Sequence, residues 1–224
     1  MAVLADYDTL TFAAIEGSHD CDIAAAVLKQ AYAELGIEIR IEPLAGRGSL
    51  ISANSGKLDG ELQRIDGISR DYTNLIQVNV PLNYIDGVVL TLDTNLTVSG
   101  WPDLRPLKIG LVSGILFAEN GTRGMNTRKV DSYSDLFLSL RSGLVDVAVV
   151  PRINAVVELA RDDSTAIQLA PGVLESFLLY HYLHEKHLQL VPFLEDVLKE
   201  MLVSGKTQQI RRYVIDQLIA GLGV

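Results

Sequence analysis

A short unit that occurs twice in the chain constrains the possible fold more than any other sequence feature. The first copy reads SGKLDGELQR and runs from Ser55 to Arg64, and the second reads SGLVDVAVVPR and runs from Ser142 to Arg152. The glycines of the two copies are 87 residues apart (143 − 56 = 87), and so are their aspartates (146 − 59 = 87). Because each copy follows an apolar, helix-like run, the repeat predicts that one helix, turn and strand unit has been used twice.

The residue types of this unit explain its expected structure. Glycine tolerates the left-handed conformation that ends a helix, and the apolar residues after each aspartate suit a buried strand. Sheets of α/β proteins bind their ligands at the carboxyl ends of the strands. We therefore expect Arg64 and Arg152, which come at or near the ends of the two strands, to face a ligand, each from its own lobe.

Apolar periodicity over the rest of the chain alternates between strand-like and helix-like segments. The further strand-like segments are residues 9–15, 37–41, 76–80, 88–92, 107–112, 129–130, 167–169 and 177–180. Helix-like segments begin near residues 46 and 115 or cover residues 21–35, 134–141, 153–160, 188–204 and 207–218.

Two separate sets of alternating strands and helices predict a two-lobed α/β protein, with two hinge crossings and a ligand cleft between the lobes. Lobe 1 is expected to comprise residues 1–88 plus 177–224, and lobe 2 residues 89–176. The loop at residues 95–106 is a candidate for the first crossing, and residues 177–180 are the expected return crossing.

Composition and charge exclude several classes of protein. The formal net charge of −9 and the lack of any basic run argue against nucleic-acid binding. No apolar run is as long as the roughly 18 residues of a membrane span, so no transmembrane helix is expected. Residues 1–6 are too short for a signal peptide, although an exported mature chain with an added start methionine would look the same.

Neither a cofactor nor a metal is indicated. Residues 46–49 (GRGS) lack the Gly-Lys-Ser/Thr ending of a phosphate loop. His181, His184 and His187 cluster, but the first two would point to opposite sides of a strand, and no second set of ligands is evident. Cys21 is the only cysteine, so no internal disulfide can form, and it is expected to be a small buried residue rather than a nucleophile.

Several of these segments resemble a known family. They are the turn at residues 55–60, the step YTNLI at 72–76 into a strand, the turn at 142–146, and the ending from residue 188 to Ile210. They resemble the bacterial extracellular solute-binding proteins of family 3, the amino-acid-type periplasmic binding proteins of ABC transporters. The resemblance implies the type II periplasmic-binding-protein fold, whose two lobes close on a small solute.

The resemblance also implies roles for particular positions. In amino-acid-binding members, a Gly-Ser/Thr pair that opens a second-lobe helix binds the ligand carboxylate, and an arginine after the first-lobe strand pairs with it. An acidic residue five positions after the second-lobe aspartate receives the ammonium group. In this chain the residue after Gly114 is Ile115, which offers no hydroxyl, and the acidic position is Pro151 (146 + 5 = 151). The arginine can be supplied by Arg70 or by Arg64.

This pattern has gained a cation and lost an anion relative to the family, which favours a solute with an anionic group. We expect that group to be held mainly by Arg64, with help from Arg70 or Arg152, because planar guanidinium groups capture carboxylates. A salt bridge on the lobe surface is the alternative for each arginine. The other candidate ligand-binding residues are Glu16 after the first strand, Tyr84 near the expected cleft, and the helix-opening pair Gly114 and Ile115.

Two further expectations concern individual residues. Ser18 and Asp20 precede a helix and are expected to be plain helix caps. The change Arg64→Ala is expected to weaken solute binding by roughly one to two orders of magnitude while leaving the melting temperature of the free protein nearly unchanged.

Together with these features, the resemblance implies an extracytoplasmic protein, located in the periplasm, that captures an amino acid or related organic anion by lobe closure for an ABC transporter. Its partners would be the small solute and a membrane permease, with no nucleic acid, and the protein would be a monomer. No Ser-His-Asp or Cys-His arrangement is evident, so no enzyme activity is expected. Two alternatives remain open. One is the ligand-binding sensor domain of a membrane receptor, and the other is a cyclohexadienyl-dehydratase-like enzyme of the same fold, with Glu16 or His19 as general acid.

Overall fold

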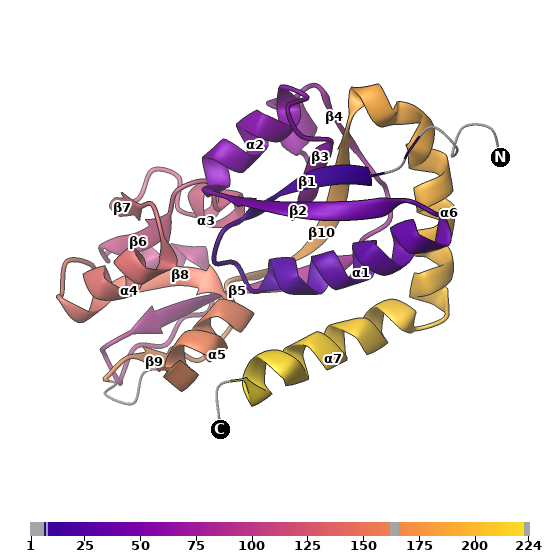
Figure 1. Ribbon diagram of the computed structural model, residues 1–224. Coiled ribbons are helices and arrows are strands. Elements are labelled where there is room, and N and C mark those ends of the chain that lie inside the picture. The colour runs from indigo at the N-terminus through magenta and orange to yellow at the C-terminus, as the bar shows by residue number, and fades with distance from the viewer. Residues whose placement is uncertain (1–6, 8, 162–165, 222–224) are drawn as a thin grey trace. The chain divides into compact units, whose positions relative to one another are not determined.

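The computed structural model describes residues 7, 9–161 and 166–221, and these residues form two compact units (Figure 1). Unit 1 contains the described residues of Met1–Tyr84 and Leu178–Gln217, and unit 2 contains those of Ile85–Phe177 and Leu218–Val224. The chain passes from unit 1 into unit 2 within strand β5 (Asn83–Thr91) and returns within strand β10 (Glu175–His184).

The first crossing therefore differs from the loop proposed at residues 95–106, which lies inside unit 2. The reason is that β5 starts at Asn83, five residues before the expected start at residue 88 (88 − 83 = 5), so a continuous strand carries the chain across. The return crossing through residues 177–180 is confirmed as part of a strand, which is β10.

Unit 1 is built on a sheet with the strand order β2-β1-β3-β10, and β4 also pairs with β10. Strand β1 is parallel to both β2 and β3, whereas β10 is antiparallel to β3. The other elements of unit 1 are β1 (Thr9–Ile15), α1 (Asp20–Glu34), β2 (Glu38–Leu44), α2 (Gly46–Asn54), β3 (Gly60–Ile65), η2 (Ile68–Arg70), β4 (Leu75–Gln77), η4 (Glu185–Leu190) and α6 (Val191–Val203). Helix α7 (Lys206–Ala220) follows, and its residues up to Gln217 belong to unit 1.

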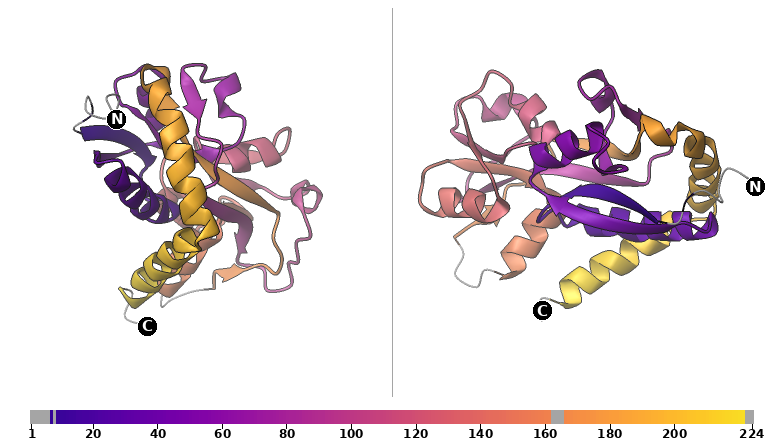
Figure 2. Two further views of the ribbon diagram at one scale, coloured as in Figure 1. Left: turned by 90° about the vertical axis from the view of Figure 1, so that its right-hand side faces the viewer. Right: turned by 45° about the horizontal axis from the view of Figure 1, so that its top comes forward.

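The core of unit 1 is built around the apolar face of its first helix. Ile23, Val27 and Ala31 are fully buried on α1, which contacts α6 and lies beside it in Figures 1 and 2. Phe12 of β1 and Leu194 of α6 belong to the same hydrophobic cluster as Val27 and Ala31. Full burial of each large apolar side chain contributes about 1.5–3 kcal/mol, so this layer fixes the sheet edge that carries the polar residues described below.

Unit 2 is built on a sheet with the strand order β5-β8-β6-β7, and β9 also pairs with β5. Strand β6 is parallel to β7 and β8, and β5 is antiparallel to β8. Its elements besides β5 are η3 (Trp101–Leu104), β6 (Ile109–Val112), α3 (Leu116–Gly121), β7 (Thr127–Val130), α4 (Tyr133–Arg141), β8 (Val147–Pro151), α5 (Arg152–Arg161) and β9 (Gln168–Leu169). No helix in the described part of the chain has both the length and the apolar character needed to cross a membrane.

The repeated unit predicted from the sequence is confirmed by matching hydrogen bonds. In the first copy, the backbone N–H of Asp59 donates to Thr11 O at 2.8 Å, and the Asp59 carboxylate accepts from the Thr11 N–H at 2.8 Å. In the second copy, the N–H of Asp146 donates to Lys108 O at 2.8 Å, and its carboxylate accepts from the Lys108 N–H at 2.6 Å. Asp59 thus ties its turn to Thr11 within β1, and Asp146 ties its turn to Lys108, the residue directly before β6.

The two copies diverge at their arginines. Both turns use a glycine with positive φ, 75° at Gly56 and 69° at Gly143, where a Cβ would cause strain. Arg64 then lies inside β3, whereas β8 ends at Pro151 and Arg152 is the first residue of α5. The arginines therefore occupy different structural positions, although the turns that precede them match.

Candidate functional site

The expected ligand-binding residues fall into two sets, which belong to different units. The residues of unit 1 are Glu16, Arg64, Arg70 and Tyr84, and those of unit 2 are Gly114, Ile115 and Arg152. Glu16 directly follows β1, Gly114 comes shortly after β6, and Arg152 directly follows β8. These three residues therefore come at the carboxyl ends of parallel strands of their own units, the edge at which α/β sheets bind ligands.

Arg64 is buried at the centre of a polar cluster in unit 1, with 4% of its surface exposed. Its Nε donates to Glu61 Oε1 at 2.9 Å, and its Nη2 donates to Ser49 Oγ at 2.6 Å and to Gly46 O at 2.8 Å. Ser49 Oγ in turn donates to Glu61 Oε2 at 2.7 Å. The guanidinium group thus ties β3 to α2, and the role of Arg64 as the main anion-binding residue stays a prediction.

Burial and ion pairing have opposite effects on the pKa of Glu61, the acid of this cluster. Burial raises the pKa of Glu61 above its usual value, while the charge of Arg64 and the hydrogen bonds from Ser49 and Arg64 lower it. The negative charge of the Glu61 carboxylate and the positive charge of the Arg64 guanidinium offset each other. In this buried region, a single unpaired charge would cost folding free energy.

Glu16 and Arg70 have the opposite character, because both side chains are exposed. The backbone of Glu16 is fixed, since its N–H donates to Leu44 O at 2.9 Å. Arg70 ends the short helix η2. Within the described part of the chain, no ion pair or side-chain hydrogen bond holds either residue, so each can meet a solute without first breaking an internal contact.

A second buried polar cluster joins the loop after β1 to β3 and β5. Ser18 Oγ donates to Asp20 Oδ1 at 2.6 Å, and Gln63 Nε2 donates to Asp20 Oδ2 at 2.6 Å. Asn83 Nδ2 donates to Gln63 Oε1 at 3.1 Å and to Asp20 O at 3.2 Å. Burial raises the pKa of the Asp20 carboxyl, and the hydrogen bond from Ser18 lowers it.

The prediction that Ser18 and Asp20 are helix caps is wrong. The residue at the N-cap position of α1 is His19, and its side chain makes no capping hydrogen bond. Asp20 is already the first residue of the helix, and its carboxylate points to Ser18 and Gln63 instead.

Gln63 and Asn83 were not anticipated as members of a polar cluster. A signal for Gln63 was present, because β3 reads GELQRI and its polar residues Glu61, Gln63 and Arg64 are all buried. Polar residues on both faces of a buried strand require hydrogen-bonding partners, so such a strand predicts an internal network. Asn83 carried no comparable signal.

Tyr84 is 46% exposed, but a cation covers one face of its ring. The guanidinium carbon of Arg211 in α7 lies 3.9 Å from the ring centre, and Arg211 Nη1 donates to Tyr84 O at 3.1 Å. The same nitrogen donates to Asn83 Oδ1. A stacking role for Tyr84 toward a solute therefore concerns only the other face of the ring.

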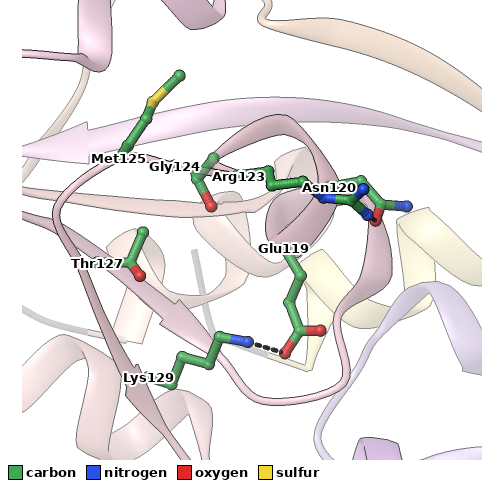
Figure 3. A pocket seen from close by; sticks show the side chains of 8 residues that line it. Glu119, Asn120, Arg123, Gly124, Met125, Thr127 and Lys129 are labelled. Atoms are coloured by element: carbon green, nitrogen blue, oxygen red, sulfur yellow. Dashed lines mark hydrogen bonds and ion pairs between the residues drawn. The ribbon is translucent and has the colours of Figure 1, made fainter.

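In unit 2, the carboxylate of Glu119 binds the backbone N–H of Gly114, one of the two residues expected to contact the solute. The Gly114 N–H donates to Glu119 Oε1 at 3.1 Å, and Lys129 Nζ donates to the same oxygen at 2.9 Å. Ile115 is 5% exposed. Figure 3 shows the Glu119–Lys129 pair at one side of a pocket of about 330 Å³, which is lined by Glu119, Asn120, Thr122, Arg123, Gly124, Met125, Thr127 and Lys129.

Arg152 forms an ion pair inside unit 2. Its Nε lies 3.4 Å from Asp86 Oδ2, and Ser176 Oγ donates to Asp86 Oδ1 at 2.6 Å. The Arg152 side chain is 39% exposed, and exposed pairs of this kind contribute little to stability. The surface salt bridge that was the alternative for Arg152 is therefore present, and its role toward a solute stays a prediction.

His181 and Cys21 are both buried in unit 1. His181 is fully buried, its Nδ1 is 3.1 Å from Leu62 O, its Nε2 is 2.9 Å from Tyr32 Oη, and burial lowers its pKa to about 4. Cys21 is buried, and burial raises the pKa of its thiol. Among the described residues, no group of three or more His, Cys, Asp or Glu side chains is arranged to hold a metal ion.

Comparison with known proteins identifies the fold. No protein-family model matches the chain. An uncharacterized protein of Shewanella oneidensis strain MR-1 is 26% identical over 189 residues, which cover 81% of this chain and 72% of that protein.

Solved structures match over almost the whole chain. An ancestral arginine-binding protein bound to glutamine has a TM-score of 0.76 at 16% identity, covering 92% of this chain and 96% of that one. The P235GK mutant of ArgBP from T. maritima has a TM-score of 0.76 at 18% identity, covering 96% and 98%. The amino acid ABC transporter substrate-binding protein AbpA from Streptococcus pneumoniae, bound to L-arginine, has a TM-score of 0.76 at 16% identity, covering 98% and 99%.

These matches define the class of fold. The chain has the two-lobed α/β fold of type II periplasmic binding proteins, as the sequence resemblance predicted. More particularly, its structural neighbours include an arginine-binding protein and an amino acid ABC transporter substrate-binding protein.

Proposed function

We propose that this protein is an extracytoplasmic, periplasmic solute-binding protein that captures an amino acid or related organic anion by lobe closure and delivers it to an ABC transporter. The observation that carries the proposal is the shared fold over 92–98% of the chain with proteins described as binding arginine or glutamine. Its partners are the solute and a membrane permease, and it acts as a monomer.

Within this proposal, the exposed Arg70 is the cation that meets the solute first. Among the residues that the structure describes, the Arg70 side chain makes no ion pair or hydrogen bond, whereas Arg64 is engaged by Glu61 and Ser49 and Arg152 by Asp86. A guanidinium group binds a carboxylate in a bidentate geometry, and such charge-assisted bonds are stronger than neutral ones. Arg64 and Arg152 also bind the solute if solute binding releases them from their contacts with Glu61, Ser49 and Asp86.

Binding without chemistry is favoured over catalysis on this fold. Among the described residues of unit 1, the buried acids Asp20 and Glu61 are both engaged in internal hydrogen bonds, which does not suit a group that must exchange a proton with a substrate. The cyclohexadienyl-dehydratase alternative depends on Glu16 or His19, and formation of phenylpyruvate from prephenate would establish it. The sensor-domain alternative shares the same binding step.

A thermal-shift screen tests the proposal. A ligand that binds only the folded protein raises its stability, by about 2.7 kcal/mol at a hundredfold excess over the dissociation constant. We expect amino acids or dicarboxylates to raise the melting temperature in a concentration-dependent way. A set of hits made up only of neutral sugars or cations lacking a carboxylate would contradict the proposed solute class.

A further inference from the structure

We propose that Arg211 of helix α7 is a positioning residue for the solute-binding edge of unit 1. It holds Asn83 and Tyr84, the last residues of unit 1 before the chain enters unit 2, and through Asn83 it holds the loop that follows β1. The inference concerns the internal order of unit 1, and only its effect on solute affinity rests on the proposed function.

The first step of the argument is the set of contacts that Arg211 makes. Its Nη1 donates to Asn83 Oδ1 and, at 3.1 Å, to Tyr84 O, while its guanidinium carbon lies 3.9 Å from the centre of the Tyr84 ring. One planar group therefore binds the side chain of Asn83, the backbone of Tyr84 and the face of its ring. A guanidinium group suits this combination because it stacks on aromatic rings and donates in a fixed geometry.

The second step is the connection from Asn83 to the loop after β1. With its carbonyl oxygen bound to Arg211, the Asn83 amide nitrogen donates to Gln63 Oε1 and to Asp20 O. Gln63 donates in turn to Asp20, which also accepts from Ser18.

The members of this chain of contacts are little exposed to solvent. Ser18, Asp20, Gln63 and Asn83 are each at most 6% exposed. Buried polar groups are costly when a partner is missing, so each member depends on the next for its orientation.

The third step is the weak apolar attachment of α7. Among the described residues of this helix, Thr207 is the only buried one, and Tyr213 is 64% exposed. The contacts of Arg211 are therefore specific anchors of the helix rather than a by-product of a large apolar interface. Arg211 thereby links the C-terminal helix to Asn83 and Tyr84, and through Asn83 to the loop after β1.

Hydrogen exchange measured by mass spectrometry tests the inference on the whole chain. The variants are Arg211→Ala, Arg211→Lys and, as a matched control, Arg212→Ala, because Arg212 is the exposed neighbour on the same helix. We expect Arg211→Ala to speed exchange in residues 18–22 by roughly tenfold or more, as for loss of a charge-assisted hydrogen bond. The backbone N–H groups of Ser18, Cys21 and Asp22 are hydrogen-bonded there and report the change.

The outcomes separate positioning from general stability. Arg211→Lys should rescue little, since a lysine cannot both stack and donate as a planar fork, and Arg212→Ala should match the wild type. Equal exchange in the two alanine variants would overturn the inference. So would a uniform increase across β1, β3 and the loop, because it would show that Arg211 only stabilises unit 1 as a whole.

Titration calorimetry adds the link to function. With a solute from the thermal-shift screen, Arg211→Ala should weaken binding by roughly tenfold, and Arg212→Ala should not. Unchanged affinity in Arg211→Ala would overturn the link between Arg211 and the solute-binding edge. If the wild type bound no solute at all, the proposed function would fail, while the exchange experiment would still decide the positioning role.

Discussion

At the scale of single residues, burial determines how much Arg64, the arginine that follows the first repeated turn, contributes to folding stability. Sequence reasoning places Arg64 at a strand end facing a ligand, and on that basis Arg64→Ala should leave the melting temperature of the free protein nearly unchanged. The structure instead places it 4% exposed, 2.9 Å from the fully buried Glu61. Removing one partner of a buried ion pair leaves an uncompensated charge.

We therefore expect Arg64→Ala to lower the free energy of unfolding by about 3–5 kcal/mol, measured by urea denaturation at neutral pH. The double variant Arg64→Ala with Glu61→Gln should lose less, because it leaves no unpaired buried charge. Arg40→Ala, at an exposed position on β2, is the control and should change little. If Arg64→Ala and the wild type had the same urea midpoint, the Arg64–Glu61 pair would not stabilise unit 1.

His181 predicts a pH dependence with a definite sign. Its Nδ1 must donate to the Leu62 carbonyl, so the neutral ring accepts from Tyr32 at Nε2, and protonation would remove that acceptor. Burial lowers its pKa from 6.5 to about 4, so between these values the unfolded chain binds more protons than the folded protein. Stability due to this residue is therefore present above pH 6.5 and is lost as pH falls toward 4.

The measurement compares the wild type with His181→Gln at pH 7 and pH 5. From pH 7 to 5 the wild type should lose about 2 kcal/mol more stability than the variant, because the variant lacks the titrating group. Both proteins contain the other buried titratable groups, such as Asp20 and Glu61. Subtracting the stability change of the variant from that of the wild type therefore cancels the contributions of those groups. Parallel pH profiles of the two proteins would mean that His181 titrates normally.

At the scale of elements, the two copies of the repeated turn differ in how many partners their aspartates hold. Asp59 accepts not only from Thr11 but also from His187 Nε2 at 2.7 Å and Lys186 Nζ at 2.8 Å. Burial alone would raise its pKa, but these hydrogen bonds lower it well below the usual range. Asp146 is exposed, and its carboxylate accepts a hydrogen bond from the Lys108 N–H.

We expect Asp59→Ala to cost about 2–3 kcal/mol and Asp146→Ala about 1 kcal/mol at pH 7, in denaturant unfolding of the intact chain. The Asp59 contribution should be present above pH 4 and decline as pH falls below it, because a depressed carboxyl pKa stabilises the folded state only when the group is ionised. Equal costs for the two variants would show that the contacts with η4 contribute nothing.

The elements themselves could be predicted largely from apolar periodicity. Helix α1 and the strand at residues 9–15 appear where the pattern places them. Strands β5 and β10 extend beyond the predicted segments because they contain polar residues, Asn83 and Asp86 in one and His181 in the other, that break the apolar pattern. These side chains are hydrogen-bonded to partners distant in sequence, which no local pattern reveals.

The candidate site was less predictable than the fold. The sequence indicates which arginines follow the repeated turns, but the burial of Arg64 depends on Ser49 and Gly46 of another element. The contact of Arg211 with Asn83 joins residues 128 positions apart. Such contacts follow from the packing of the whole unit rather than from any local motif.

At the scale of the whole molecule, the chain shares its fold with amino-acid-binding proteins, and we propose that it captures a carboxylate-bearing solute. Isothermal titration calorimetry tests this most directly, using the amino acid or organic acid with the largest thermal shift and its carboxamide analogue, which differs only in the charged group. We predict saturable binding of the acid, binding of the amide at least about tenfold weaker, and loss of most of that difference in Arg70→Ala. Equal affinities for the acid and its amide, or no saturable binding of any carboxylate-bearing solute, would contradict the account.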